Sequence, residues 1–391
     1  MLTHDLPRAE RAVRSVFVVF LINGVAVASL LSRVPQIRDG LHLRPGPLGV
    51  LLLMISIGSL MSLPLAGSVV HRVGPRRAVT VGSMLFTVGF AIAAVGSRVG
   101  APMVGVGLFM VGLAVGQWDV AQNVEAAAAE RLVGRSIMSR FHASFSVGTV
   151  IGALVGAAMN ALKIAPVWHL LGAAAVVGAG VPLASRGFMP AAADDGDAER
   201  HSPWKAWTEP RTLLIGLFVL CMAFTEGTGN DWLGVAAIDG YHASATLGSF
   251  AYVAFVVAMT TGRWFGPKFL DRHGRVPVLR TSALMSLAGV LIVVEGPSLA
   301  TAMVGVLLWG LGAALGFPTG MSAAADDPAY AAGRVSTVAT IGYAAFLAGP
   351  SIIGAVGDHV GVLRALTITA GVVGVGAMVA SSTRPLERPT P

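Results

Sequence analysis

The chain has 391 residues, of which 54% are hydrophobic and only 12% are charged. An ordinary soluble protein has about 25% charged residues, so this composition excludes intrinsic disorder and most soluble folds. The net charge of +7 comes from basic residues in short clusters between apolar segments, which is typical of membrane orientation rather than of nucleic-acid binding. The one cysteine, Cys221, lies in an apolar run and excludes an intramolecular disulfide and a cysteine-based metal site.

Charge-poor stretches of about 20 residues recur along the chain, and each is long enough to cross a ~30 Å hydrocarbon layer. They predict twelve membrane-spanning helices, at 14–32, 48–70, 78–97, 102–124, 137–161, 166–186, 211–233, 244–267, 277–295, 298–322, 335–357 and 361–382. No cleaved signal peptide is expected, because the basic head leads into a full-length span with no small-residue cleavage site.

The basic residues are distributed unevenly between the two sides that these spans define. With a cytoplasmic start, most of the 27 lysines and arginines fall on the inner side. The positive-inside rule then predicts a multi-pass protein of the cytoplasmic (inner) membrane, with both termini in the cytoplasm.

The longest hydrophilic stretch, 187–210, is rich in Ala, Asp and Pro and has no periodic apolar face. It is typical of a linker. We therefore expect a six-helix bundle in residues 1–186, a cytoplasmic linker in 187–210, and a second six-helix bundle in 211–391.

The two halves are similar to each other at a constant offset of 200 residues. Met103–Val106 matches Met303–Val306 residue for residue, and the loop His71–Gly74 aligns with Asp271–Gly274. One offset that holds in a span and in a loop indicates an internal duplication. The predicted fold class is therefore all-α and integral to the membrane, with two pseudo-symmetric bundles.

Two short basic turns carry the most specific family signal. The stretch 67–77 reads GSVVHRVGPRR, and 271–275 reads DRHGR. Both resemble the G-x-x-x-D-R-x-G-R-R loop of the major facilitator superfamily, in which glycine permits a tight turn and the charges can latch helix ends. Arg72, Asp271 and Arg272 are accordingly candidate gating residues. His71 occupies the usual Asp position, and the alternative is that the arginines only anchor the chain.

Further segments resemble the MosC-like branch of this superfamily, which includes a rhizopine-related membrane protein. They are Phe20–Gly24, Ser32–Pro35, Gly112–Asn123, Ser139–Gly148, Glu226–Trp232 and Phe346–Pro350. The resemblance covers nearly the whole chain and implies secondary transport by alternating access. Most members of that branch have no assigned substrate, so the resemblance narrows the mechanism more than the cargo.

Ionisable side chains inside spans cost about 2.5–3.5 kcal/mol each and usually face a cavity or a partner. Asp119 aligns with Thr319, and Glu226 aligns with Ala26, so the repeat does not require either acid. We predict that Asp119 or Glu226 couples transport to protons, with His142 as a partner of Asp119. The alternative for His142 is a purely structural hydrogen bond.

Asp119, Gln122 and Asn123 share one face of a helix, with Trp118 beside them. Such a stripe can bind a polyol or a sugar while the indole stacks on its apolar face. The alternative is polar contact between helices. The candidate substrate-binding residues are Asn23, Gln117, Trp118, Asn123, Tyr252, Trp309 and Tyr343.

Arg33 and Asp231 fall at the outer ends of the corresponding spans one and seven. We predict that they pair as an extracellular gate. The alternative is that the arginine snorkels and that the aspartate and its neighbouring tryptophan lie at the membrane interface.

The sequence as a whole predicts a monomeric secondary transporter that moves a small sugar- or cyclitol-like solute by proton-coupled symport. Its expected partners are that solute and the lipid bilayer, without nucleic acid, and it needs no cofactor beyond the proton as coupling ion. Alternatives are a proton-driven efflux antiporter for a drug or metabolite, and a non-transporting receptor or scaffold. No enzyme is expected, because no metal-ligand cluster, phosphate loop or suitably spaced nucleophile and base occurs.

Overall fold

The computed structural model describes residues 6–43, 45–189 and 203–386. These residues are helical without any strand, and they contain ten helices that are long and apolar enough to cross a membrane. One of the ten, α3 (Pro45–Val99), contains two helices joined at a kink at Gly74, and a shorter apolar helix covers Phe250–Phe265. Each of the twelve predicted spans therefore falls on one helix or on two consecutive helices, and the predicted all-α membrane fold is confirmed.

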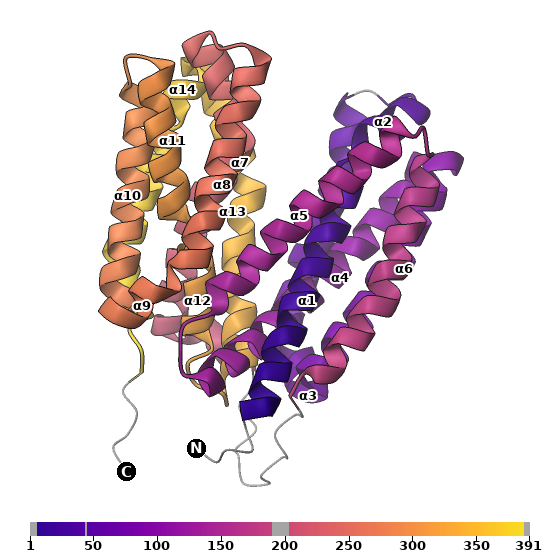
Figure 1. The fold of residues 1–391 in the computed structure, drawn as a ribbon, viewed down its shortest axis with the longest axis vertical. Coiled ribbons are helices and arrows are strands. Elements are labelled where there is room, and N and C mark those ends of the chain that lie inside the picture. Colours follow the sequence, from indigo (N-terminus) through magenta and orange to yellow (C-terminus); the bar gives the residue numbers. More distant parts are fainter. Residues whose placement is uncertain (1–5, 44, 190–202, 387–391) are drawn as a thin grey trace. The chain divides into compact units, whose positions relative to one another are not determined.

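The chain divides into two compact units (Figure 1). The first contains residues 1–134, 141–205 and 328–336, and the second contains 135–140, 206–327 and 337–391. Residues 190–202, most of the predicted linker, lie outside the described residues, which resume in a 3₁₀ turn at Pro203–Thr208.

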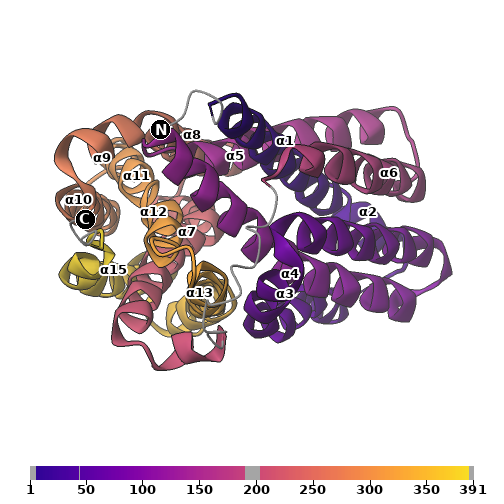
Figure 2. The same ribbon diagram turned by 90° about the horizontal axis from the view of Figure 1, so that it is seen from below.

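Among the described residues, the first unit contains six helices and the first residues of α13 (Ala331–Val360). The six are α1 (Leu6–Leu31), α2 (Val34–Gly40), α3, α4 (Ala101–Val133), α5 (Met138–Ala161) and α6 (Pro166–Ala184). Helices α3 and α4 lie side by side in both views (Figures 1 and 2) and share an extensive contact. Phe86 and Trp118 meet edge to face at 5.6 Å between ring centroids and form part of the bundle interior.

The second unit repeats this order of spans with helices of different lengths. They are α7 (Pro210–Tyr241), α8 (Ala245–Phe265), α9 (Pro267–His273), α10 (Arg275–Glu295), α11 (Leu299–Ala313), α12 (Gly316–Ala324), α13 (Ala331–Val360), α14 (Val362–Ala365) and α15 (Thr367–Val379). Helix α10 packs against both α11 and α15 (Figure 2). Phe255 and Trp309 meet edge to face at 5.7 Å in the interior.

Both halves use the same backbone conformation at the basic turn. Gly74 has φ 78° and ψ 159°, and Gly274 has φ 80° and ψ 164°. A positive φ of this size is strained for any residue with a Cβ, so glycine is required at both turns. The matched geometry at positions 200 residues apart agrees with the duplication that the sequence predicts.

The fourth helix of each half follows a different offset. A Cβ added to Gly107 would lie 2.6 Å from the Gly89 carbonyl oxygen, and one added to Gly305 would lie 2.7 Å from the Gly289 carbonyl oxygen. Gly89 and Gly289 are 200 residues apart, whereas Gly107 and Gly305 are 198 apart. In the packing, a residue of α4 is therefore equivalent to the residue 198 positions later in α11, whereas sequence matching alone predicts an offset of 200.

This register corrects one detail of the sequence comparison, because Asp119 then corresponds to Phe317 rather than to Thr319. Helices rich in Gly, Ala and Val match each other in more than one register, and only the close backbone contacts fix the correct one. Neither Phe317 nor Thr319 is ionisable, so Asp119 is still an acid that the repeat does not require.

Candidate functional site

The predicted polar stripe on α4 forms a buried hydrogen-bonded cluster in the first unit. Gln122 Nε2 donates to Asp119 Oδ1 at 3.1 Å. Asn123 Nδ2 donates to the Asp119 backbone oxygen at 2.8 Å and to Oδ1 at 3.2 Å. All three side chains are buried. The i, i+3 and i+4 spacing therefore directs two amide groups onto one carboxylate.

His142 on α5 extends this cluster. Its Nε2 lies 3.2 Å from Asn123 Oδ1. Because the Asn123 amide nitrogen faces the oxygens of Asp119, its oxygen must face His142, so Nε2 is the donor. The Phe20 ring meets the imidazole edge to face at 5.0 Å. The predicted association of Asp119 with His142 thus takes the form of a chain through Asn123, which we call the Asp119 chain.

The other predicted binding residues of the first unit surround α4 and α1. Asn23 is buried, and its Oδ1 has no hydrogen-bond partner among the described residues. Gln117 Nε2 donates to the Ser62 backbone oxygen at 3.2 Å. Trp118 is fully buried and packs on Phe86. The Trp118 ring therefore fills the bundle interior instead of lining an open surface.

Glu226 on α7 forms a buried ion pair with Arg263 on α8. Arg263 Nη2 lies 2.8 Å from Oε1 and 2.7 Å from Oε2, and the two side chains are only 13% and 5% exposed. Arg263 lies inside the predicted span 244–267, and its sequence position alone predicts no role for it. An unpaired charge inside a span is costly, and this cost is the feature from which the pairing of these two residues could be predicted.

Arg263 also contacts the point where the tenth span is broken. Helix α11 ends at Ala313 and α12 begins at Gly316. Pro318 has no N–H, so the Ala314 carbonyl cannot receive the usual bond from four residues ahead. Arg263 Nε donates to that oxygen instead, at 3.4 Å. One guanidinium thus connects the break to Glu226.

Three predicted aromatic residues of the second unit occupy different environments. Trp309 is fully buried, and its Nε1 donates to the Thr225 backbone oxygen at 3.1 Å. Tyr343 lies between Phe317 and Phe346, with centroid distances of 6.3 and 5.8 Å. Tyr252 is 42% exposed. Trp309 therefore packs in the interior, whereas Tyr252 presents surface.

The predicted gating loops are exposed. Asp271 Oδ1 accepts the Ser136 backbone N–H at 2.8 Å, within the second unit. Arg72 and Arg272 are exposed at the ends of their turns. In the first unit, Ser336 at the start of α13 donates to the Leu63 backbone oxygen.

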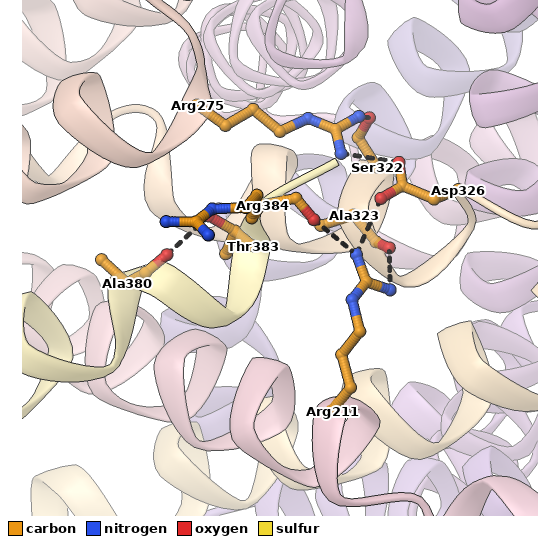
Figure 3. Close-up of polar contacts among 8 residues, drawn as sticks. All are labelled: Arg211, Arg275, Ser322, Ala323, Asp326, Ala380, Thr383 and Arg384. Carbon is orange, nitrogen blue, oxygen red and sulfur yellow. Dashed lines mark hydrogen bonds and ion pairs between the residues drawn. The ribbon is translucent and has the colours of Figure 1, made fainter. Parts of the chain in front are cut away.

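A second cluster of charges joins helix ends near the turn that contains Asp271 (Figure 3). Arg211 Nη2 lies 2.8 Å from Asp326 Oδ2, and Arg275 Nη1 lies 2.6 Å from Asp326 Oδ1. Arg275 also donates to Ser322 Oγ at 2.9 Å, and Arg211 donates to the Arg384 backbone oxygen at 2.9 Å. One carboxylate thereby holds together the ends of α7, α10 and α12.

The two residues predicted as an outer gate differ in burial. Arg33 is 1% exposed and donates to the backbone oxygens of Gly156 and Ile164, both in its own unit. Asp231 is exposed on α7. The gating role of this pair stays a prediction.

The comparisons with known proteins agree with this architecture. A family model described as Major Facilitator Superfamily matches residues 16–344. An uncharacterized transporter of Sinorhizobium fredii, y4wD, is 31% identical over 87% of this chain and 90% of the relative. The membrane protein MosC of Rhizobium meliloti is 28% identical over 96% of this chain and 90% of MosC, as the resemblance to its branch predicts.

Among solved structures, the fucose:proton symporter FucP of E. coli covers 98% of this chain and 100% of its own, with a TM-score of 0.81 and 16% identity. The similar proteins are transporters and not enzymes. The family match and the relative above 30% identity together show that this chain is a multi-pass membrane protein belonging to the major facilitator superfamily.

Proposed function

We propose that this protein is a proton-coupled symporter that moves a small sugar- or cyclitol-like solute across the cytoplasmic membrane by alternating access. The observation that carries the proposal is the Asp119 chain, a titratable carboxylate hydrogen-bonded through Asn123 to His142 inside an apolar bundle. Buried titratable groups of this kind mark proton pathways in membrane proteins. The fold neighbour FucP, which is named as a fucose:proton symporter, supports the same reaction class.

The chain offers a physical route from a proton to a change in hydrogen bonding. A carboxylate only accepts hydrogen bonds, whereas a protonated carboxyl also donates one. When Asp119 takes up a proton at Oδ2, Oδ1 still accepts from Gln122 and Asn123, and the new O–H can donate to a hydroxyl group of the solute. Solute binding and proton binding then favour each other, as symport requires.

The Glu226–Arg263 pair is the second candidate for the coupling site. Protonation of Glu226 would remove the carboxylate charge that faces the buried Arg263 guanidinium, and breaking a buried ion pair costs several kcal/mol. In the Asp119 chain, by contrast, the carboxylate accepts hydrogen bonds from the neutral amides of Gln122 and Asn123. We therefore assign coupling to Asp119 and a structural and positioning role to the Glu226–Arg263 pair.

The candidates for solute contact in this proposal are the polar and aromatic residues that the sequence predicts in each unit. Asn23, Gln117 and Asn123 are the candidate amides of the first unit, and Tyr252 and Tyr343 are the candidate hydroxyl groups of the second. Trp118 and Trp309 support the site by shape, since both are fully buried against phenylalanine rings.

The first experiment identifies a solute. Purified protein is heated with fucose, xylose, inositol, amino acids and antibiotics, and the unfolding temperature is followed. A solute at 100 times its Kd adds about 2.7 kcal/mol of stability. A rise in the unfolding temperature with a sugar or cyclitol supports the proposal. A rise with antibiotics, and none with any polar solute, would favour the alternative of proton-driven efflux.

The second experiment tests coupling in proteoliposomes with that solute. We expect Asp119→Asn to abolish accumulation driven by a pH gradient while preserving exchange of labelled for unlabelled solute, because only the proton step is lost. Asp39→Asn, at an exposed carboxylate in α2, is the matched control and should behave as wild type. Uphill accumulation at the wild-type level in Asp119→Asn would overturn the assignment.

A further inference from the structure

A group of buried polar side chains with unsatisfied atoms lies away from the Asp119 chain, at the end of the first unit that the sequence predicts to face outward. Arg33 follows α1 directly, and its side chain is almost completely buried. No carboxylate forms an ion pair with it in the part of the chain that the structure describes. A buried cation without a partner costs several kcal/mol, so its persistence calls for a compensating group.

Backbone carbonyls satisfy only part of the guanidinium. Nη1 donates to the Gly156 oxygen at 3.4 Å, and Nη2 donates to the Ile164 oxygen. The buried Nε has no hydrogen-bond partner among the described residues. One charged donor is therefore left over at the connection between α5 and α6.

His169 on α6 provides a second set of unsatisfied atoms at the same place. Its side chain is 7% exposed, and neither ring nitrogen has a hydrogen-bond partner among the residues described. A Cβ added to Gly156 would lie 3.5 Å from His169 Cε1 and 1.9 Å from Ser32 Oγ. Gly156 is also the residue whose carbonyl receives Arg33, so these groups converge on one small region.

The start of α6 adds a favourable electrostatic environment. The 19-residue helix begins at Pro166, two residues after the carbonyl that receives Arg33, and Ala165 gives its first turn no side-chain cap. The helix dipole gives the start of α6 a partial positive charge, while Pro166 has no N–H and the Trp168 N–H donates to the Ala165 oxygen. An anion is the group that such a terminus accepts.

We propose that Arg33, His169 and the first turn of α6 form a site for a small inorganic monoanion of the size of chloride. Arg33 Nε and one N–H of the imidazole donate to the ion, and its charge compensates the buried guanidinium. Ser32 packs closely against Gly156 beside these groups, so we assign the site to a small ion rather than to a bulky phosphate group. The bound ion stabilises the connection between α1, α5 and α6, and this role is independent of the transported solute.

The test is thermal unfolding of the purified full-length protein in detergent. Sodium chloride or sodium bromide replaces sodium gluconate at constant ionic strength, so that screening is unchanged. We expect a saturable rise of about 2–5 °C with either halide and no rise with phosphate. Arg33→Gln and His169→Ala should remove the halide effect, whereas Arg98→Gln, at an exposed arginine, should retain it.

Two outcomes overturn the proposal. One is the absence of a saturable halide effect in the wild type. The other is an equal effect in wild type, Arg33→Gln and His169→Ala, which would show that halides act elsewhere. If Arg33→Gln does not fold, His169→Ala decides, because it keeps the guanidinium and removes only the second donor. A parallel sample contains phosphatidylglycerol in gluconate without halide. If this lipid stabilises the wild type but not Arg33→Gln, and halides do not, the ligand is a lipid headgroup and the proposal of a halide site is overturned.

Discussion

At the scale of single residues, the two units bury acids in different ways. Asp119 accepts hydrogen bonds from neutral amides, whereas Glu226 is neutralised by the guanidinium of Arg263 at 2.7 Å. Protonation of a carboxylate adds an O–H donor beside the neutral amides that it accepts from. In a buried ion pair, protonation instead removes the charge that faces the partner.

This difference predicts the stability of variants at the ion pair. Glu226→Gln should lower the free energy of unfolding by about 3–5 kcal/mol, because the buried Arg263 loses the carboxylate of this ion pair. The double variant Glu226→Gln with Arg263→Met should recover much of the loss. Thermal and denaturant unfolding in detergent measure both effects.

The exposed pair of Arg38 and Asp39 provides the matched control for this experiment. Arg38→Gln should change stability by no more than about 1 kcal/mol, as is usual for surface ion pairs. Wild-type stability in Glu226→Gln would contradict the structural role assigned to the buried pair.

At the scale of elements, the turn glycines and the broken tenth span determine how neighbouring helices are joined. Gly74 and Gly274 have matching positive φ values in the two halves. The fourth span is one continuous helix, whereas its counterpart is divided into α11 and α12 ahead of Pro318. Discontinuous helices in transporters often lie near binding sites, which is consistent with the position of Arg263 between the break and Glu226.

The turn geometry gives a prediction at this scale. Gly274→Ala should destabilise the protein by about 1–2 kcal/mol, since alanine is strained at a φ of 80°. Gly371→Ala, in α15 with no atom within 4 Å of the added Cβ, should cause no loss. The two unfolding temperatures, measured side by side, check the expectation, and equal values would contradict it.

At the scale of the whole molecule, one architecture carries two different sets of polar groups. Both units have the same order of spans and the same turn conformation, but the Asp119 chain occurs in the first and the Glu226–Arg263 pair in the second. The predicted orientation of the molecule follows from its arginines rather than from its packing. This orientation can be tested by labelling introduced cysteines, because the sequence contains a single cysteine, Cys221, which is buried.

We expect that in a Cys221→Ala background Arg98→Cys reacts with a membrane-impermeant maleimide in intact cells, because the sequence predicts this residue on the outer side. Arg272→Cys, at an exposed residue predicted on the inner side, should react only after the membrane is permeabilised. Mass shift after labelling measures both reactions. The reverse pattern would contradict cytoplasmic termini.

The sequence by itself determined the all-α membrane fold, the twelve spans, the duplication and the family, because spans depend on the length and polarity of each segment and the family motifs are local. The helical spacing of Asp119, Gln122 and Asn123 also predicted their shared face. The tertiary structure decided the ion pair of Glu226 with Arg263, the burial of Trp118, the two-residue shift of the fourth span and the meeting of Arg33 with His169. These features depend on contacts between residues far apart in the chain, and Gly- and Ala-rich helices can pack in several registers until close backbone contacts select one.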